Sequence, residues 1–85
     1  MSVAEQFAAA QERVKTLTRS PSNQDLLELY ALFKQGSLGD VSGTRPGMFD
    51  LKGRAKFDAW ATKKGMNKDQ AQRMYVDLVD RLVKG

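Results

Sequence analysis

The chain of 85 residues contains no cysteine and no histidine. Without cysteine there can be no disulfide bond, no thiolate metal ligand and no thiol nucleophile. Without histidine, the commonest general base and the commonest metal ligand are missing as well. An enzyme built from this sequence would have to work with lysine, tyrosine, hydroxyl or carboxylate groups, and no such nucleophile has an obvious partner base. We therefore expect a protein that is not an enzyme and that holds no metal.

Long apolar runs are absent too. No segment of the sequence approaches the roughly 18 consecutive apolar residues of a transmembrane helix, and the N-terminus lacks the basic and then apolar pattern of a secretory signal. We expect a soluble, cytoplasmic protein with no stable membrane insertion.

What remains is the composition of a folded globular domain, with 41% apolar and 28% charged residues. The length suffices for one core, so we expect residues 1–85 to form a single domain and a monomer. The net charge of +4 is unevenly distributed, because residues 52–68 hold six cations and one acid, a sum of +5 that leaves −1 for the rest. Such a basic segment indicates an anionic partner or a merely solvated face.

The first amphipathic segment begins with a capping box, in which Ser2 and Glu5 each satisfy a free backbone donor. An apolar face then recurs at helical spacing and predicts a helix up to Ser20, where Pro21 follows. This face comprises Val3, Phe7, Ala10, Val14 and Leu17.

A second helix is predicted to begin at Ser22 or Asn23 and to end at Gly36. Its apolar stripe comprises Leu26, Leu29, Tyr30 and Phe33, with Leu27 to one side. A loop rich in glycine and proline follows as far as Asp50. Loops longer than about 12 residues are usually functional or disordered.

A third helix is expected to start at Asp50 and to reach about Lys64, before Gly65. Asn67 then caps a fourth helix that runs almost to the C-terminus. The fourth helix has the strongest amphipathic stripe of the chain, formed by Ala71, Met74, Tyr75, Leu78, Val79, Leu82 and Val83. No segment alternates as a strand would, so the prediction is an all-α domain of four helices.

Two lysine pairs stand beside aromatic residues. Tyr30 and Lys34 lie one helical turn apart, and Lys52 and Lys56 repeat that spacing on the third helix. Two ammonium groups and a phenol that converge would bind a phosphate, and the nearby ring of Phe33 would stack on a base. The combination is typical of a nucleotide site.

A purely structural interpretation of the same residues is also open at this point. Tyr30, Phe33 and Tyr75 lie on apolar stripes and would serve as core residues, with the Tyr75 hydroxyl at the surface. The lysines would then form a solvated face. Trp60 is expected in the core.

Several short motifs stand in order along the chain. They are Tyr30-x-x-Phe33-Lys34-Gln35, Gly39-Asp40, Pro46-Gly47-x-x-Asp50, and the run KGRAKFDAW from Lys52 to Trp60. In this order and at these separations they resemble the signature of the acyl-CoA-binding proteins, over roughly Phe7 to Leu82. The resemblance implies a four-helix bundle of up-down-down-up topology. It also implies reversible binding, intracellular transport and pool-buffering of medium- to long-chain fatty acyl-CoA esters, without catalysis or cofactor.

The resemblance further implies roles for single residues. The positions of Tyr30, Lys34 and Lys56 would hold the 3′-phosphate of coenzyme A, and Phe33 would stack on adenine. Those of Lys15, Lys52 and Tyr75 would also contact the ligand. The acyl chain groove would be bordered by Leu26 and Leu27.

Three positions depart from the common family pattern. Phe33 and Phe57 replace Tyr and Trp of many relatives, and Arg54 replaces Lys. Phe33 keeps the stacking face and loses a hydroxyl, whereas the other two changes are conservative.

The alternative function is that of a small basic helical nucleic-acid-binding domain, since the +5 segment lies beside aromatic residues. No helix-turn-helix spacing is evident, which speaks against that alternative.

Overall fold

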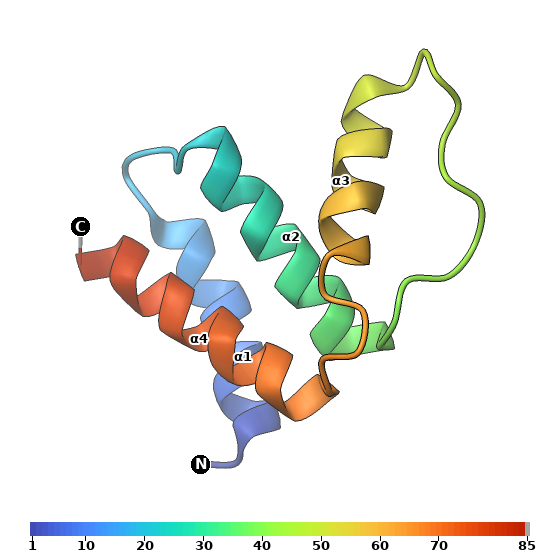
Figure 1. Cartoon of the computed structure of the whole chain (residues 1–85). Helices are drawn as coiled ribbons and strands as arrows, with labels where there is room; N and C mark the ends of the chain where they lie inside the picture. The colour runs from blue at the N-terminus through green and yellow to red at the C-terminus, as the bar shows by residue number, and fades with distance from the viewer. Residues whose placement is uncertain (85) are drawn as a thin grey trace.

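The structure, a computed structural model, describes residues 1–84 and consists of helices joined by loops (Figure 1). The elements are α1 (Val3–Arg13), the 3-10 helix η1 (Val14–Thr16), α2 (Asn23–Leu38), α3 (Leu51–Ala61) and α4 (Lys68–Lys84). α2 and α3 run in the same direction and α4 runs back (Figure 1). No strand occurs in the described range, and none of its helices is long and apolar enough to cross a membrane. The predicted all-α fold of four helices is confirmed.

The helix beginnings lie where the sequence predicts them, because side-chain caps are local. Ser2 Oγ accepts a hydrogen bond from the Glu5 N–H at 3.1 Å, and Glu5 Oε1 accepts one from the Ser2 N–H at 3.1 Å. The other caps are Ser22 to Asp25 N at 3.1 Å, Asp50 to Gly53 N at 2.9 Å and Asn67 to Gln70 N at 2.7 Å. Each such cap contributes about 1 kcal/mol to helix stability.

The end of the first helix differs from the prediction. α1 ends at Arg13, a single 3-10 turn follows, and Leu17 is extended with φ −61° and ψ 129°. The hydroxyl of Thr16 donates to the Arg13 carbonyl at 2.7 Å, which is the acceptor that Leu17 N–H would use in a continued α-helix. Leu17 N–H bonds to Val14 O instead, at 3.4 Å. The prediction of a helix up to Ser20 is therefore wrong.

The role of Gly36 is also corrected. α2 continues through Gly36 to Leu38, and Gly39, with φ +86°, is the residue that ends the helix. A Cβ on Gly36 would lie 3.0 Å from Gln72 Cγ and 3.2 Å from Phe7 Cζ. Glycine at this position therefore allows α4 and α1 to approach α2.

The third helix is shorter than predicted. α3 ends at Ala61, and residues 62–65 form turns that lead to Gly65, which has φ +93°. The predicted end at about Lys64 is therefore about one turn too late. The sequence could not separate the two cases, because residues in a helix and in successive turns are similar in type.

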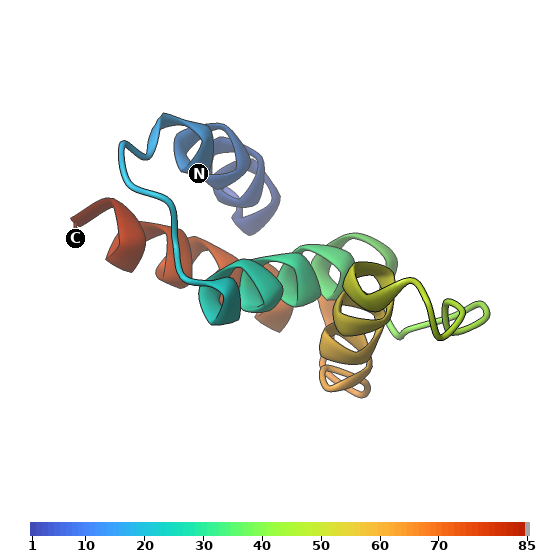
Figure 2. The ribbon, with the colours of Figure 1, turned by 90° about the horizontal axis from the view of Figure 1, so that it is seen from above.

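α2 and α4 form the central pair, since they pack against each other, α4 also packs against α1, and α2 also packs against α3. Seen from above, α1 and α3 lie on opposite sides of the α2 and α4 pair (Figure 2).

The core consists of Phe7, Ala10, Leu29, Leu32, Ala71, Tyr75, Leu78 and Val79. Across residues 1–84 the backbones of α1 and α2 are not in direct contact. The Phe7 ring spans the space between them, 5.1 Å from the Tyr75 ring in a T-shaped pair and 6.2 Å from the Phe33 ring, centroid to centroid.

A buried amide links the end of α2 to the turn before α4. Gln35 is fully buried, and its Nε2 donates to Met66 O at 2.7 Å and to Asp40 Oδ1 at 2.9 Å. Asp40 Oδ1 also accepts from Gly65 N–H at 2.8 Å. The pKa of Asp40 is lowered, first by the hydrogen bond from Gly65 and then by that from Gln35.

The long segment between α2 and α3 is fastened at two points. Trp60 is buried as predicted, outside the cluster named above, and donates its indole N–H to Gly39 O at 2.8 Å. Arg45 binds Asp58 through two hydrogen bonds, Nε to Oδ1 at 2.9 Å and Nη2 to Oδ2 at 2.7 Å. The bidentate pair lowers the pKa of Asp58 and ties the middle of the segment to α3.

We predict that Gln35→Ala lowers the free energy of unfolding by about 2 to 4 kcal/mol, because Met66 O and Asp40 lose a donor and a cavity opens. Urea denaturation followed by circular dichroism measures this. The control is Gln24→Ala, an exposed position on the same helix, which should change stability by less than about 0.5 kcal/mol. Equal losses in the two variants would contradict the role of Gln35.

The lowered pKa of Asp40 predicts a pH dependence. Its contribution to stability is present above the unfolded pKa of about 3.9 and is lost as the pH falls through the lower folded value. In Asp40→Asn, whose amide oxygen still accepts the two hydrogen bonds, stability should therefore fall less steeply on acidification below about pH 4. Asp77→Asn, at an exposed carboxylate, is the control. Acid unfolding profiles of Asp40→Asn and the native chain with the same slope would refute this prediction.

Candidate functional site

Two lysine ammonium groups flank one tyrosine ring. Lys34, one turn after Tyr30 on α2, has its Nζ 5.8 Å from the Tyr30 ring centroid, and Lys56 of α3 has its Nζ 5.4 Å from the same centroid. Lys34 Nζ also lies 5.5 Å from the Trp60 ring. These separations allow cation–π attraction, which orients the lysines while leaving their N–H donors available. α2 and α3 thus bring Tyr30, Lys34 and Lys56 together.

The positive charge at this place is not neutralised by the protein. Within residues 1–84, none of Lys34, Lys52 and Lys56 forms an ion pair. Lys52 lies one turn before Lys56 on α3 and is exposed. Its ammonium would therefore contact a ligand from the solvent side of the site. Uncompensated cations held close together attract an anion.

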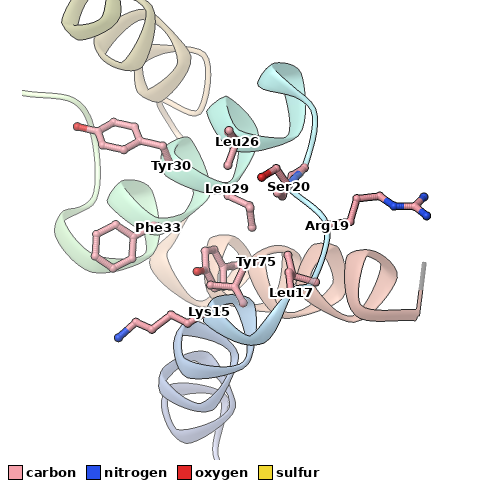
Figure 3. Close-up of a pocket in the computed structure, with 11 residues that line it drawn as sticks. Lys15, Leu17, Arg19, Ser20, Leu26, Leu29, Tyr30, Phe33 and Tyr75 are labelled. Atoms are coloured by element: carbon pink, nitrogen blue, oxygen red, sulfur yellow. The ribbon is translucent and has the colours of Figure 1, made fainter.

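A cavity of about 430 Å³ lies between the chain segment after α1 and the first half of α2. It exists because α1 ends at Arg13 and the chain turns away, so that nothing fills the space beside α2. Its lining residues are Val14, Lys15, Leu17, Arg19, Ser20, Pro21, Leu26, Leu29, Tyr30, Phe33 and Tyr75. Figure 3 shows the Lys15 ammonium and the Tyr30 hydroxyl at the same edge of the cavity, while the Arg19 guanidinium points away.

Phe33 and Tyr75 belong both to the core and to the cavity wall. Their ring centroids are 6.5 Å apart, Phe33 is half-buried, and Tyr75 is buried. Burial raises the pKa of Tyr75 above its ordinary value, and its hydroxyl, which is neutral at physiological pH in any case, can donate a hydrogen bond. The structural and the functional interpretations of these rings are therefore compatible.

Of Lys15, Leu26 and Leu27, which the sequence predicts at the ligand, the structure puts only the first two at the cavity. Lys15 lies on η1 at the rim of the cavity, with its Nζ 2.8 Å from Glu12 Oε2 in an exposed ion pair. Leu26 lines the cavity, but Leu27 does not. Consecutive helical residues point in directions about 100° apart, so Leu29, three positions after Leu26, takes the place beside it.

Several lining residues were not predicted from the sequence as parts of a site. Leu17 and Pro21 are the main examples, because their position depends on the early end of α1. Leu29 could have been predicted, because it lies three positions after Leu26 on the apolar stripe of α2.

The chemistry available here is binding. No group of three or more acidic residues in the described part of the chain could hold a metal ion. A cation pair beside a phenol can hold a phosphate, a half-buried ring can stack on a base, and an apolar cavity can take a hydrocarbon chain.

Comparison with known proteins gives a consistent result. The family model described as acyl CoA binding protein matches residues 4–79. Acyl-CoA-binding protein homolog 1 of Caenorhabditis elegans is 60% identical over 77 residues, covering 91% of this chain and 90% of that protein. The acyl-CoA-binding protein homolog of Drosophila melanogaster is 52% identical over 81 residues, covering 95% and 94%.

A solved structure agrees in fold. The crystal structure of Oryza sativa acyl-CoA-binding protein 2 superposes with a TM-score of 0.93 at 41% identity, covering 98% of this chain and 92% of that one. The match of family model, sequence and fold over nearly all of the chain shows that it belongs to the acyl-CoA-binding protein family.

Proposed function

We propose that this protein binds medium- to long-chain fatty acyl-CoA esters reversibly, without making or breaking bonds, and so carries and buffers them in the cytoplasm. The observation that carries the proposal is the convergence of Tyr30, Lys34 and Lys56 next to an apolar cavity. The names of the relatives support it. Residues 1–85 act as one monomeric domain in this proposal.

The nucleotide end of the ligand would occupy the basic edge. The 3′-phosphate would lie between Lys34 and Lys56, with the Tyr30 hydroxyl as a neutral donor. Adenine would stack on the open face of Phe33, an interaction worth roughly 1 to 3 kcal/mol by analogy with other bases. Phe33 needs no hydroxyl for stacking, so the departure from the family pattern leaves this role intact.

The remaining polar contacts would come from three sides. Lys15 would approach from η1, Lys52 from α3 and the neutral hydroxyl of Tyr75 from α4. The acyl chain would enter the cavity, bordered by Leu26 and Leu29. Leu27 is left out of the groove because it does not line the cavity.

Burial of the chain dominates the binding energy. A sixteen-carbon acyl group has about fourteen methylenes, and at about 0.8 kcal/mol each their full burial contributes at most about 11 kcal/mol. Contacts to the nucleotide add several kcal/mol, and immobilising the ligand costs a comparable amount. Sub-micromolar affinity is therefore attainable.

We predict that Lys34→Ala and Lys56→Ala each weaken binding of palmitoyl-CoA by about 1.5 to 3 kcal/mol, because each removes a hydrogen bond to a charged phosphate. Isothermal titration calorimetry measures the loss. The control is Lys84→Ala at the C-terminal end of α4, which makes the same charge change away from the cavity lining. If both site variants bind as tightly as the control, the phosphate site is wrongly placed.

A second prediction concerns ligand identity. Shortening the chain from palmitoyl- to octanoyl-CoA removes eight methylenes and should weaken binding by up to about 6 kcal/mol. Free palmitate and DNA should bind far more weakly than palmitoyl-CoA in the same titration. Equal affinity for the two esters would refute the role of the cavity. DNA binding that falls steeply with salt, without a response to palmitoyl-CoA, would instead establish the alternative of a nucleic-acid-binding domain.

A further inference from the structure

Three large apolar side chains are exposed at one corner of the molecule. Met48, Phe49 and Leu51 are 68%, 95% and 74% exposed. Asp50 N–H bonds to Gly47 O at 3.0 Å, which closes a turn with Met48 and Phe49 at its two central positions. Central turn positions usually hold Gly, Pro, Asn, Asp or Ser. A methionine followed by a phenylalanine there needs an explanation other than turn formation.

Local structure does not explain Phe49. It directly precedes Asp50, the cap of α3, and an apolar residue at that position often packs against the fourth residue of the helix. The fourth residue here is Arg54, and an exposure of 95% leaves the Phe49 ring with almost no contact of any kind. Its apolar surface is therefore available to a partner.

The surroundings of this corner are basic. Lys52 and Lys56 follow on α3 and are exposed, and neither forms an ion pair within residues 1–84. The nearest acid, Asp50, uses its carboxylate to cap the helix, where it accepts from Gly53 N–H at 2.9 Å. Protruding apolar side chains beside unpaired cations match the interface of a bilayer that carries anionic headgroups.

Size and shape favour a bilayer over a protein partner. A stable protein interface buries about 800 Å² on each side, whereas even a fully buried aromatic side chain accounts for only about 150 to 250 Å². Three side chains on a protruding turn fall short of that area. They suffice for shallow insertion into a lipid interface, where the depth is only about 5 to 10 Å.

We infer that the corner formed by Met48, Phe49 and Leu51 is a reversible docking site for anionic membrane surfaces. The corner lies at the start of α3, and α2 begins at the same end of the molecule (Figure 1). Docking would therefore direct the end of α2 that carries the cavity residue Leu26 toward the bilayer. The apolar corner residues do not line the cavity, but Lys52 and Lys56 also belong to the proposed ligand site, so the charge part of the inference rests on the proposed function.

The test is co-sedimentation with vesicles of phosphatidylcholine, alone or mixed with phosphatidylserine. We expect binding to the mixed vesicles that weakens with added salt and is much lower on phosphatidylcholine alone. Phe49→Ser should reduce the partition coefficient by about tenfold or more. Leu38→Ser, at a residue 61% exposed at the end of α2, is the matched control and should leave the partition unchanged.

Two results would overturn the inference. One is equal vesicle binding by the native chain and Phe49→Ser, or equal binding to both lipid compositions. The other is a loss of palmitoyl-CoA affinity in solution by Phe49→Ser as large as its loss of vesicle binding, which would place the corner in the ligand groove instead. Both positions are exposed, so we expect both variants to fold, and circular dichroism checks this.

Discussion

The contact of three aromatic rings is the interaction on which the arrangement of this protein depends. Phe7, Phe33 and Tyr75 come from α1, α2 and α4, and their ring centroids lie 5.1 to 6.5 Å apart. The α1 and α2 backbones have no direct contact in the described range, so these rings and α4 set the distance between the two helices. That distance leaves the cavity, and Phe33 and Tyr75 form part of its wall. Core packing and the binding surface are thus made by the same side chains.

The basic part of the site depends on the contacts that hold α3 against α2. Lys56 reaches Tyr30 because α3 is held against α2, and several polar contacts fix that position. Trp60 binds the end of α2 through Gly39 O, and the Lys63 ammonium lies 2.8 Å from Glu28 Oε2 in a partly buried ion pair. An anion site built on two helices requires this rigidity, because mobile lysines would lose more entropy on binding.

Helix beginnings were predictable from the sequence and helix ends were not. Beginnings at Ser2, Ser22 and Asp50 follow from hydrogen bonds between residues three positions apart. The end of α1 also involves a local contact, the Thr16 hydroxyl on the Arg13 carbonyl, whereas the continuation of α2 through Gly36 depends on other helices. The sequence predicts a stop at Gly36 because a glycine inside a helix and one at its end give the same local signal, but Gly36 is required by the close approach of Gln72 and Phe7 from other helices. The same limit applies to the site, where Leu27 and Leu26 are equally apolar and only Leu26 faces the cavity.

By itself the sequence determined four helices, their caps, the absence of cysteine and histidine chemistry, the basic segment and the order of motifs that places the chain in its family. These are properties of neighbouring residues or of composition. Only the tertiary structure decided that Lys34 and Lys56 flank one ring, that Leu17 and Pro21 complete a cavity, and that Phe49 stands exposed. The reason is physical: distances between residues far apart in the chain are set by side-chain packing of whole helices, and no local pattern records them.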